Sequence, residues 1–177
     1  MRRRAAVLAL ALALAGLVTA CRATPTVERD PGPLLQTDAL AYPLARDEVG
    51  YATRIAYTFR NQTGETVVLP NCDGDTRPML QKERDGRWYD AWEPYRGRCE
   101  SPPVVIGPGK TFTDTFDVFG APPGSNVLPA FVFPEVEGVY RLFWVQARPA
   151  ADSAGTPDLQ RSLDMRLRVS NPFTLVR

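Results

Sequence analysis

Histidine is absent from the 177 residues of this chain, and lysine occurs only at Lys82 and Lys110. Histidine is the commonest general base and metal ligand in proteins, so its absence excludes Ser–His and Cys–His catalysis. The chain also has no long run of one charge, and its 21 basic and 20 acidic residues nearly balance. Nucleic-acid-binding domains carry clustered basic residues, so we expect no nucleic-acid partner.

One apolar run is present, and it stands at the start of the chain. Residues 5–20 read AAVLALALALAGLVTA, with three arginines before them and small residues ahead of Cys21. A basic start, a short apolar segment and small residues at a cleavage site are typical of a secretory signal peptide. The run is shorter than the roughly 20 residues that cross a bilayer as a helix. We therefore predict a removable leader at residues 1–20 rather than a transmembrane anchor.

The residues Val18-Thr19-Ala20-Cys21 resemble the bacterial lipobox. The resemblance implies that Cys21 receives a thioether-linked diacylglycerol, which places the mature protein on a membrane outside the cytoplasm. The alternative is an ordinary secretory signal followed by an unmodified cysteine. Residues 22–33 (RATPTVERDPGP) are polar and proline-rich, so we expect them to tether residues 34–177, the folded domain. Arg22, rather than Asp, follows the cysteine and is compatible with the outer membrane if the host has two membranes.

Removal of the leader leaves about 157 residues with a formal net charge of about −2, a usual size for one domain. The chain's 44% hydrophobic and 23% charged residues are an ordinary globular composition. Cys72 and Cys99 remain once Cys21 carries lipid. An exported protein lies in an oxidising compartment, so we predict a structural disulfide between them. The chain has no CxxC motif, which argues against a redox role.

Alternating apolar and polar residues, typical of half-buried strands, recur from residue 51 onward. Two hairpins are predicted: strands 51–59 and 65–69 joined at Asn61–Gly64, and residues 78–92 turning at Asp85–Gly86. Further strands are predicted at 104–106, 111–119, 139–147 (the most hydrophobic, hence central) and 163–169, with the same parity continuing to residue 175. Proline-rich residues 121–134 and polar residues 150–161 predict long connections. Seven or eight strands without a helical period predict an all-β fold, a single immunoglobulin-like antiparallel β-sandwich.

Glu137-Gly138-Val139-Tyr140 resembles the approach to a tyrosine corner, in which a tyrosine hydroxyl bonds to nearby backbone. Immunoglobulin domains carry a cysteine two residues after that tyrosine, and Leu142 stands there in this chain. The disulfide is therefore expected between loops at one end of the sandwich, rather than between the sheets.

Three further segments resemble small bacterial immunoglobulin-like modules, of which the intracellular proteinase inhibitor domain is the best-named type. They are Tyr57-Thr58-Phe59-Arg60-Asn61 with Thr63, Asp85-Gly86-Arg87-Trp88, and Ile106-Gly107-Pro108-Gly109-Lys110-Thr111. The resemblance spans most of residues 45–147 and implies the fold more than an activity. The lipid leader and the cysteine pair depart from an intracellular inhibitor.

Aromatic and arginine residues concentrate in residues 87–96 (RWYDAWEPYR). Exposed Trp, Tyr and Arg are typical of binding hot spots and sugar-stacking platforms. Trp88 is expected to pack in the core. Trp92, Tyr95 and Arg96 stand nearer to a loop, and we predict that they form a binding surface.

Two groups of polar residues offer other chemistry. Asn71–Asp75 (NCDGD) suits either a calcium ion or an Asx-type turn, and the turn is favoured because the spacing does not match an EF-hand. We therefore expect no metal and no cofactor. A pair of carboxylates, as in glycoside hydrolysis, would come from Asp73, Asp75, Glu83, Asp90, Glu93, Asp114, Asp117, Glu135 and Glu137.

No GxSxG, P-loop or GxGxxG motif accompanies these residues. The features together predict a non-enzymatic binding or structural lipoprotein of the cell envelope, with an envelope protein as its partner. One alternative is a proteinase-inhibitor-like module that offers a loop such as Gly120–Pro129 to a protease. The other is a hydrolase that uses a carboxylate pair.

Overall fold

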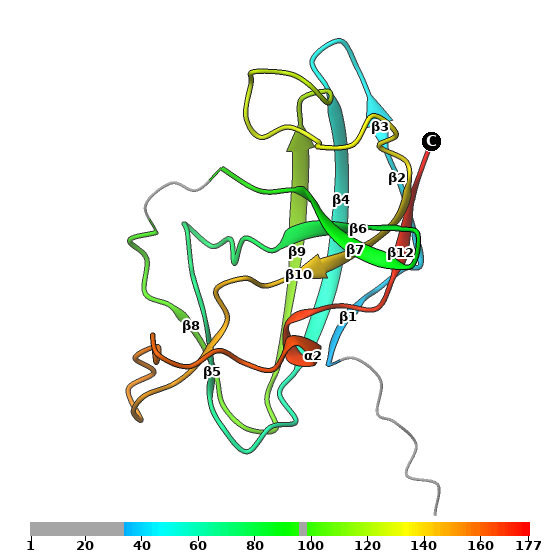
Figure 1. The fold of residues 1–177 in the computed structure, drawn as a ribbon. Helices are drawn as coiled ribbons and strands as arrows, with labels where there is room; N and C mark the ends of the chain where they lie inside the picture. The colour runs from blue at the N-terminus through cyan, green and yellow to red at the C-terminus, as the bar shows by residue number, and fades with distance from the viewer. Residues whose placement is uncertain (1–33, 96–98) are drawn as a thin grey trace, which may run out of the picture. The chain divides into compact units, whose positions relative to one another are not determined.

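Three β-sheets and one helical turn make up the described part of the chain, residues 34–95 and 99–177 of the computed structural model (Figure 1). The mostly β fold class is therefore confirmed. The predicted leader, lipid site and tether at residues 1–33 lie outside the described residues. No helix within the described ranges has the length and apolar character needed to cross a membrane.

The first sheet is built on two long strands that alternate as predicted. Its strands are β1 (Leu35–Thr37), β3 (Ala45–Arg46), β4 (Tyr51–Arg60) and β9 (Thr111–Gly120). β4 and β9 pair antiparallel over ten residues. β1 and β3 pair with the other edge of β4, one at each end of that strand.

The second sheet has the order β2-β12-β10-β6-β7. Its strands are β2 (Ala41–Pro43), β6 (Met79–Arg84), β7 (Arg87–Trp92), β10 (Gly138–Phe143) and β12 (Phe173–Val176). β10 lies at the centre, as predicted for the most hydrophobic segment. The β6–β7 hairpin is also confirmed, and Asp85 (φ 52°) and Gly86 (φ 75°) both adopt the positive φ that a type I′ turn requires.

The first predicted hairpin is wrong, because its second strand belongs to a third sheet. This sheet contains β5 (Val67–Leu69), β8 (Val104–Ile106) and β11 (Arg148–Pro149), and β5 pairs with β8 and β11 rather than with β4. Both edges of β4 are already occupied at that end, because Phe59 lies opposite Leu35 of β1 and Phe112 of β9. The Asn61 amide donates to the Glu65 and Ile106 carbonyls, which directs the chain toward β8 instead.

The predicted strand at 163–169 is also wrong, because residues Met165–Arg168 form the helical turn α2. Asp164 caps this turn by accepting a hydrogen bond from the Arg166 amide, a local bond that competes with an extended backbone. Leu163 is buried, whereas Met165 is exposed, so the period of two did not mark one buried face here. The rest of that segment is a strand as predicted, β12.

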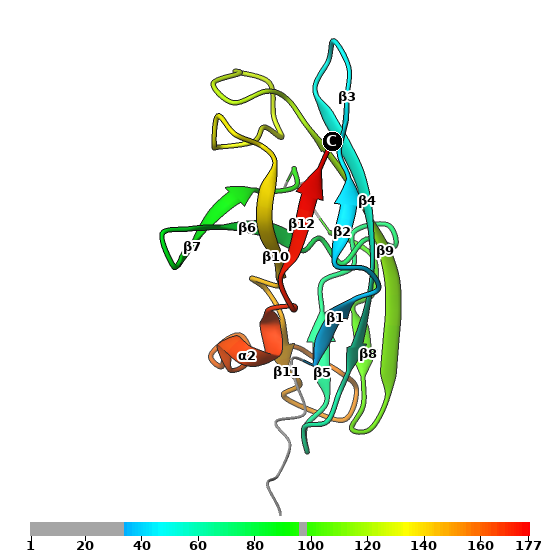
Figure 2. The ribbon, with the colours of Figure 1, turned by 90° about the vertical axis from the view of Figure 1, so that its right-hand side faces the viewer.

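Figure 2 shows the first and second sheets as two layers, with β4 and β9 on one side and β6, β10 and β12 on the other. Large buried side chains from both layers form one core: Ile55, Tyr57, Phe59 and Phe116 from the first, and Leu80, Tyr140, Leu142 and Phe173 from the second. Trp144 packs edge-on against the rings of Tyr57 and Phe59. The Tyr140 hydroxyl donates to the Val136 carbonyl at 2.6 Å, so the predicted side-chain-to-backbone bond is present.

Candidate functional site

The predicted binding surface at Trp92, Tyr95 and Arg96 does not form as expected. Trp92 is 3% exposed, its ring packs edge-on against Phe116, and its Nε1 donates to the Phe119 carbonyl at 3.0 Å. The Tyr95 side chain is 69% exposed, and Arg96 lies outside the described residues. Trp92 is therefore a core residue, and its assignment to a surface was wrong.

Trp88 was expected in the core but lies half-buried outside it. A register irregularity between Leu80 and Gln81 shifts the pairing of β6 with β7 and brings Trp92 opposite Leu80. Trp88 then lies half-buried on the other face of the sheet, with the Arg141 guanidinium 4.4 Å from its ring. Such an irregularity depends on tertiary packing, so the residue pattern carried no signal for it.

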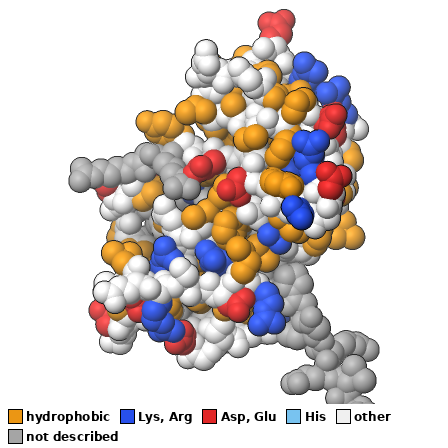
Figure 3. Space-filling view, in the orientation of Figure 1, with side chains coloured by type: hydrophobic (Ala, Val, Ile, Leu, Met, Phe, Trp, Pro, Cys, Tyr) orange, Lys and Arg blue, Asp and Glu red, His pale blue; other side chains and the backbone are white. Residues whose placement is uncertain are grey.

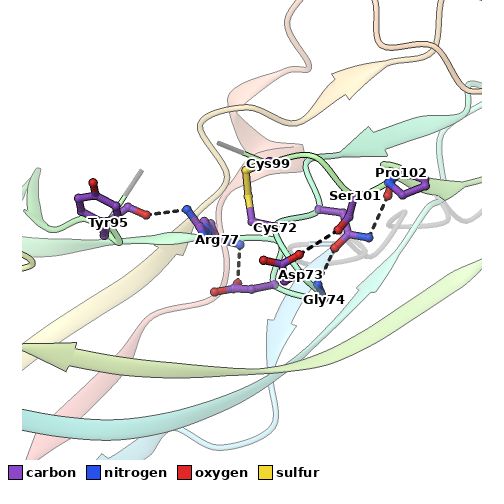
Figure 4. The surroundings of a disulfide bond; sticks show 10 residues. Cys72, Asp73, Gly74, Arg77, Tyr95, Cys99, Ser101 and Pro102 are labelled. Carbon is purple, nitrogen blue, oxygen red and sulfur yellow. Dashed lines mark hydrogen bonds between the residues drawn. A yellow bond between two sulfur atoms is a disulfide. The ribbon is translucent and has the colours of Figure 1, made fainter. Parts of the chain in front are cut away.

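The predicted disulfide between Cys72 and Cys99 is present, with their Cα atoms 4.3 Å apart (Figure 4). The turn that contains Cys72 is of the Asx type, because the Gly74 amide donates to Asn71 Oδ1 at 2.7 Å. Asp73 accepts from the Ser101 hydroxyl across the loop. The oxygen atoms of this segment therefore organise the turn, as the favoured interpretation predicted.

A small pocket lies beside the disulfide. Its volume is about 50 Å³, and its lining includes Cys72, Arg77, Trp144 and Gln146. The buried indole N–H of Trp144 has no hydrogen-bond partner among the described residues. A pocket of this size has room for a few water molecules, which would satisfy that donor. It is too small to serve as a site for a ligand of ordinary size.

Several carboxylates proposed for a hydrolytic pair have separate structural partners. Asp90 accepts from the Gln81 amide, and Asp114 accepts from the Tyr57 hydroxyl. Asp117 pairs with Arg54, and that guanidinium lowers the pKa of the Asp117 carboxyl. These contacts account for three of the nine candidates without invoking catalysis.

Exposed hydrophobic side chains gather at the end of the first sheet where β4 begins and β9 ends. They are Val49 (82% exposed), Phe119 (63%), Val127 (65%) and Leu128 (73%), and we call them the end surface. All four line one shallow groove of about 250 Å³. Single exposed hydrophobics are common, but a contiguous group with a groove is typical of an interaction site. Figure 3 shows hydrophobic side chains over the corresponding upper part of the molecule.

Local hydrogen bonds hold Val49 at this surface. Asp47 Oδ1 accepts from the Gly50 amide at 2.9 Å and the Val49 amide at 2.8 Å, and these bonds lower the pKa of the Asp47 carboxyl. A Cβ atom on Gly50 would lie 2.3 Å from the Gly120 carbonyl oxygen, so only glycine allows the turn to approach β9. The turn between β3 and β4 is thereby fixed against the end of β9.

The connection after β9 is closed at its base, which holds Val127 and Leu128 outward. The Ala121 amide donates to the Pro129 carbonyl at 2.8 Å, and the Phe131 amide donates to the Ala121 carbonyl at 3.1 Å. Phe131 is 2% exposed and packs edge-on against the Tyr51 ring. The apolar residues of the loop therefore lie on a structured support.

The end surface lies far from β1, the first strand that the structure describes. Leu35 of β1 pairs with Phe59 near the end of β4, whereas Tyr51 at the start of β4 pairs with Gly120 beside the end surface. At about 3.3 Å per residue, this part of β4 is roughly 25 Å long. Figure 1 shows β1 and the β9–β10 connection near opposite ends of β4.

Sequence reasoning named the Gly120–Pro129 loop but missed Val49 and Phe119. The signal for Phe119 was its parity, because Phe116 and Val118 occupy the buried positions of β9. Nothing in the pattern around Val49 pointed to this site. Searches with the whole chain found no matching family model and no matching curated protein.

Proposed function

We propose that this protein is a lipid-anchored, non-enzymatic binding module of the cell envelope, and that a partner protein docks on the end surface. The observation that carries the proposal is the exposure of Val49, Phe119, Val127 and Leu128 around one groove on structured elements. The absence of histidine and the oxidation of Cys72 and Cys99 support a non-enzymatic role.

The end surface is remote from the first described strand. β1 pairs near the end of β4, whereas the end surface lies where β4 begins. An exposed apolar surface with a groove on structured elements suits a partner protein of the envelope.

The strand order supports a finer proposal for the fold. β1-β4-β9 corresponds to strands A, B and E of an immunoglobulin-like sandwich, and β6-β10-β12 corresponds to strands C, F and G. β7 then takes the place of the additional strand beside C. Tyr140, near the start of β10, bonds back to Val136 as a tyrosine corner does.

The lipid anchor is tested by Cys21→Ser. We expect the wild-type protein to sediment with membranes and the variant to appear in the soluble fraction, because the thioether that holds the acyl chains is lost. The measurement is the distribution of each protein between pelleted membranes and supernatant, with Cys99→Ser as a control that keeps Cys21. Membrane sedimentation of the Cys21→Ser variant would contradict the anchor.

The docking surface is tested by photo-crosslinking in intact cells. A photoreactive residue at Val127 of the full-length protein is expected to form an adduct with one envelope protein. The same residue at Leu159, an exposed leucine that is 80% accessible and lines a different surface, is expected to form none. An adduct that is identical at both positions, or absent at both, would refute the docking surface.

A charge within the end surface should disrupt docking. We expect Leu128→Asp to reduce the Val127 adduct at least about tenfold, because burying a carboxylate against a hydrophobic partner is costly. The matched variant Leu159→Asp should leave the adduct unchanged. Both leucines are exposed, so the stability of either variant should change by less than about 0.5 kcal/mol, which urea unfolding would verify.

A proteinase-inhibitor-like function is the second candidate. The Gly120–Pro129 loop favours it, because the loop is tied at its base and presents Val127 and Leu128 to solvent. A peptidase in the Val127 adduct, inhibited by the wild-type protein and not by Leu128→Asp, would establish this function. An adduct with a non-peptidase would exclude it.

A further inference from the structure

The outer edge of β9 pairs with no strand in the part of the chain that the structure describes. β9 is hydrogen-bonded to β4 along its whole length, and β4 occupies one edge only. In an immunoglobulin-like sheet, strand D pairs with this second edge of strand E. The strand in that sequence position, β8, pairs with β5 instead. The first sheet therefore ends on a strand of ten residues whose second edge has no strand partner among the described residues.

Two hydrogen bonds identify which backbone groups of β9 point outward. The Phe119 carbonyl accepts from Trp92, and the Thr115 amide donates to the side chain of Asp114, so neither group is directed at β4. Alternate residues of an antiparallel strand direct both backbone groups to the same edge. Thr111, Thr113 and Asp117 therefore also direct their N–H and C=O groups outward.

The side chains of β9 leave this edge accessible. Thr111, Thr113 and Thr115 are exposed on one face and short, and the strand contains no proline and no lysine. The pairing with β4 is continuous, without a bulge that would turn the edge away. Asp114 is an inward-pointing charge, but the Tyr57 hydroxyl bonds to its carboxylate at 3.1 Å. The usual devices that block strand addition are thus almost absent.

We propose that an extended segment of the partner protein adds to β9 as a further strand. Only an extended backbone matches the row of outward N–H and C=O groups. On one face its side chains would adjoin the partly buried Phe112, and on the other the exposed threonines, so the segment alternates apolar and polar residues. The Phe119 carbonyl already accepts from Trp92, so pairing would use the outward groups of Thr111, Thr113 and Asp117. The exposed Phe119 side chain of the end surface would then lie next to the end of the added strand.

This inference rests on the proposed function and names the chemistry of the partner. The protein's own residues 22–33 are a poorer occupant, because Pro25, Pro31 and Pro33 lack the amide hydrogens that pairing needs. A second copy of this chain is the other occupant that the experiment distinguishes.

The probe is an acetylated, amidated nonapeptide that alternates valine with threonine and carries a lysine at each end. Its binding to the full-length protein in detergent is followed by fluorescence anisotropy of a labelled form. Two further peptides are N-methylated, one on the valines and one on the threonines, so that each loses the donors of a single strand edge. We expect one of them to bind at least about tenfold more weakly and the other to bind as the parent peptide does. Absence of parent binding at about 1 mM, or equal binding by all three peptides, would overturn strand addition.

Two substitutions at Thr113 test whether the edge of β9 binds the peptide. Thr113→Pro removes an outward amide hydrogen and should weaken parent binding at least about tenfold, whereas Thr113→Val keeps that hydrogen and should not. Both variants lose the contact with the Thr58 hydroxyl, so they are matched in that respect. If Thr113→Pro does not fold, the N-methylated peptides on the wild-type protein decide the question. Dimerisation by light scattering that Thr113→Pro abolishes would identify a second copy as the occupant, contrary to the proposal.

The experiments can reject strand addition to β9 and docking on the end surface independently of each other. If the peptides do not bind by one edge while Leu128→Asp still abolishes the Val127 adduct, strand addition is rejected and the end surface is retained. If Leu128→Asp leaves the adduct intact, the proposed docking surface itself is rejected.

Discussion

Between about pH 9 and about pH 11, three buried tyrosines are expected to lower the free energy of unfolding by up to about 4 kcal/mol. Three tyrosines, Tyr42, Tyr57 and Tyr140, are buried with their hydroxyls in internal hydrogen bonds. Burial and the neighbouring Asp38 raise the pKa of Tyr42 to about 12. Burial likewise raises the pKa values of Tyr57 and Tyr140 well above the ordinary range.

The sign follows from proton binding in the two states. Below the ordinary tyrosine pKa of 10.0, folded and unfolded chains both keep these protons, and the stability is fully present. Above it the unfolded chain releases protons that the folded chain retains, so unfolding becomes easier with each step in pH. Each tyrosine contributes about 1.4 kcal/mol per pH unit until the pH passes its folded pKa.

Urea unfolding at several pH values measures this effect, and Tyr57→Phe is the control. That variant is less stable at every pH, but its stability should fall by about 1.4 kcal/mol less over the same range. Burial lowers the pKa of Lys82, which acts in the opposite direction below the ordinary lysine value of 10.5 and is common to both proteins. An identical pH dependence in the wild type and in Tyr57→Phe would contradict the role of the buried hydroxyl.

Loss of the Cys72–Cys99 disulfide is expected to lower the free energy of unfolding by about 3 kcal/mol. The bond joins residues 27 positions apart, and it restricts the unfolded chain by closing that loop. In the folded protein it connects the turn after β5 to the segment before β8, so it joins the two ends of the segment that contains the β6–β7 hairpin. We expect the variant Cys72→Ser with Cys99→Ser to fold and to unfold at a lower urea concentration.

Reduction provides the matched comparison. Dithiothreitol should destabilise the wild-type protein to the level of the double variant and leave the variant itself unchanged. Before reduction, iodoacetamide should label neither Cys72 nor Cys99, and after reduction and unfolding it should label both. Labelling of both thiols in the untreated exported protein would show that the bond does not form in its compartment.

Local chemistry explains which parts of the fold were predictable. The turn at Asp85–Gly86 needs positive φ at both positions, and these two residue types accept it at little cost, so the hairpin turn follows from two adjacent residues. The alternation in 51–59 and 111–119 likewise reports one buried face per strand. The cysteine pair followed from composition and the predicted export signal.

The errors occurred where distant residues decide the outcome. β5 pairs with β8 and β11 because β1 and β9 occupy both edges of β4. Trp92 entered the core because β6 and β7 shift their register beside it. The cap at Asp164 converted an alternating segment into a helical turn.

The sequence alone determined the β-rich class, the main hairpin turn and the cysteine pair, because each depends on residue types close together or on composition. Only the tertiary structure decided the pairing of strands and the candidate site. The end surface brings Val49, from the turn before β4, to Phe119, Val127 and Leu128, some seventy residues later. No local pattern specifies that these four residues lie close together, because their proximity results from the ten-residue pairing of β4 with β9 and from packing around Phe131.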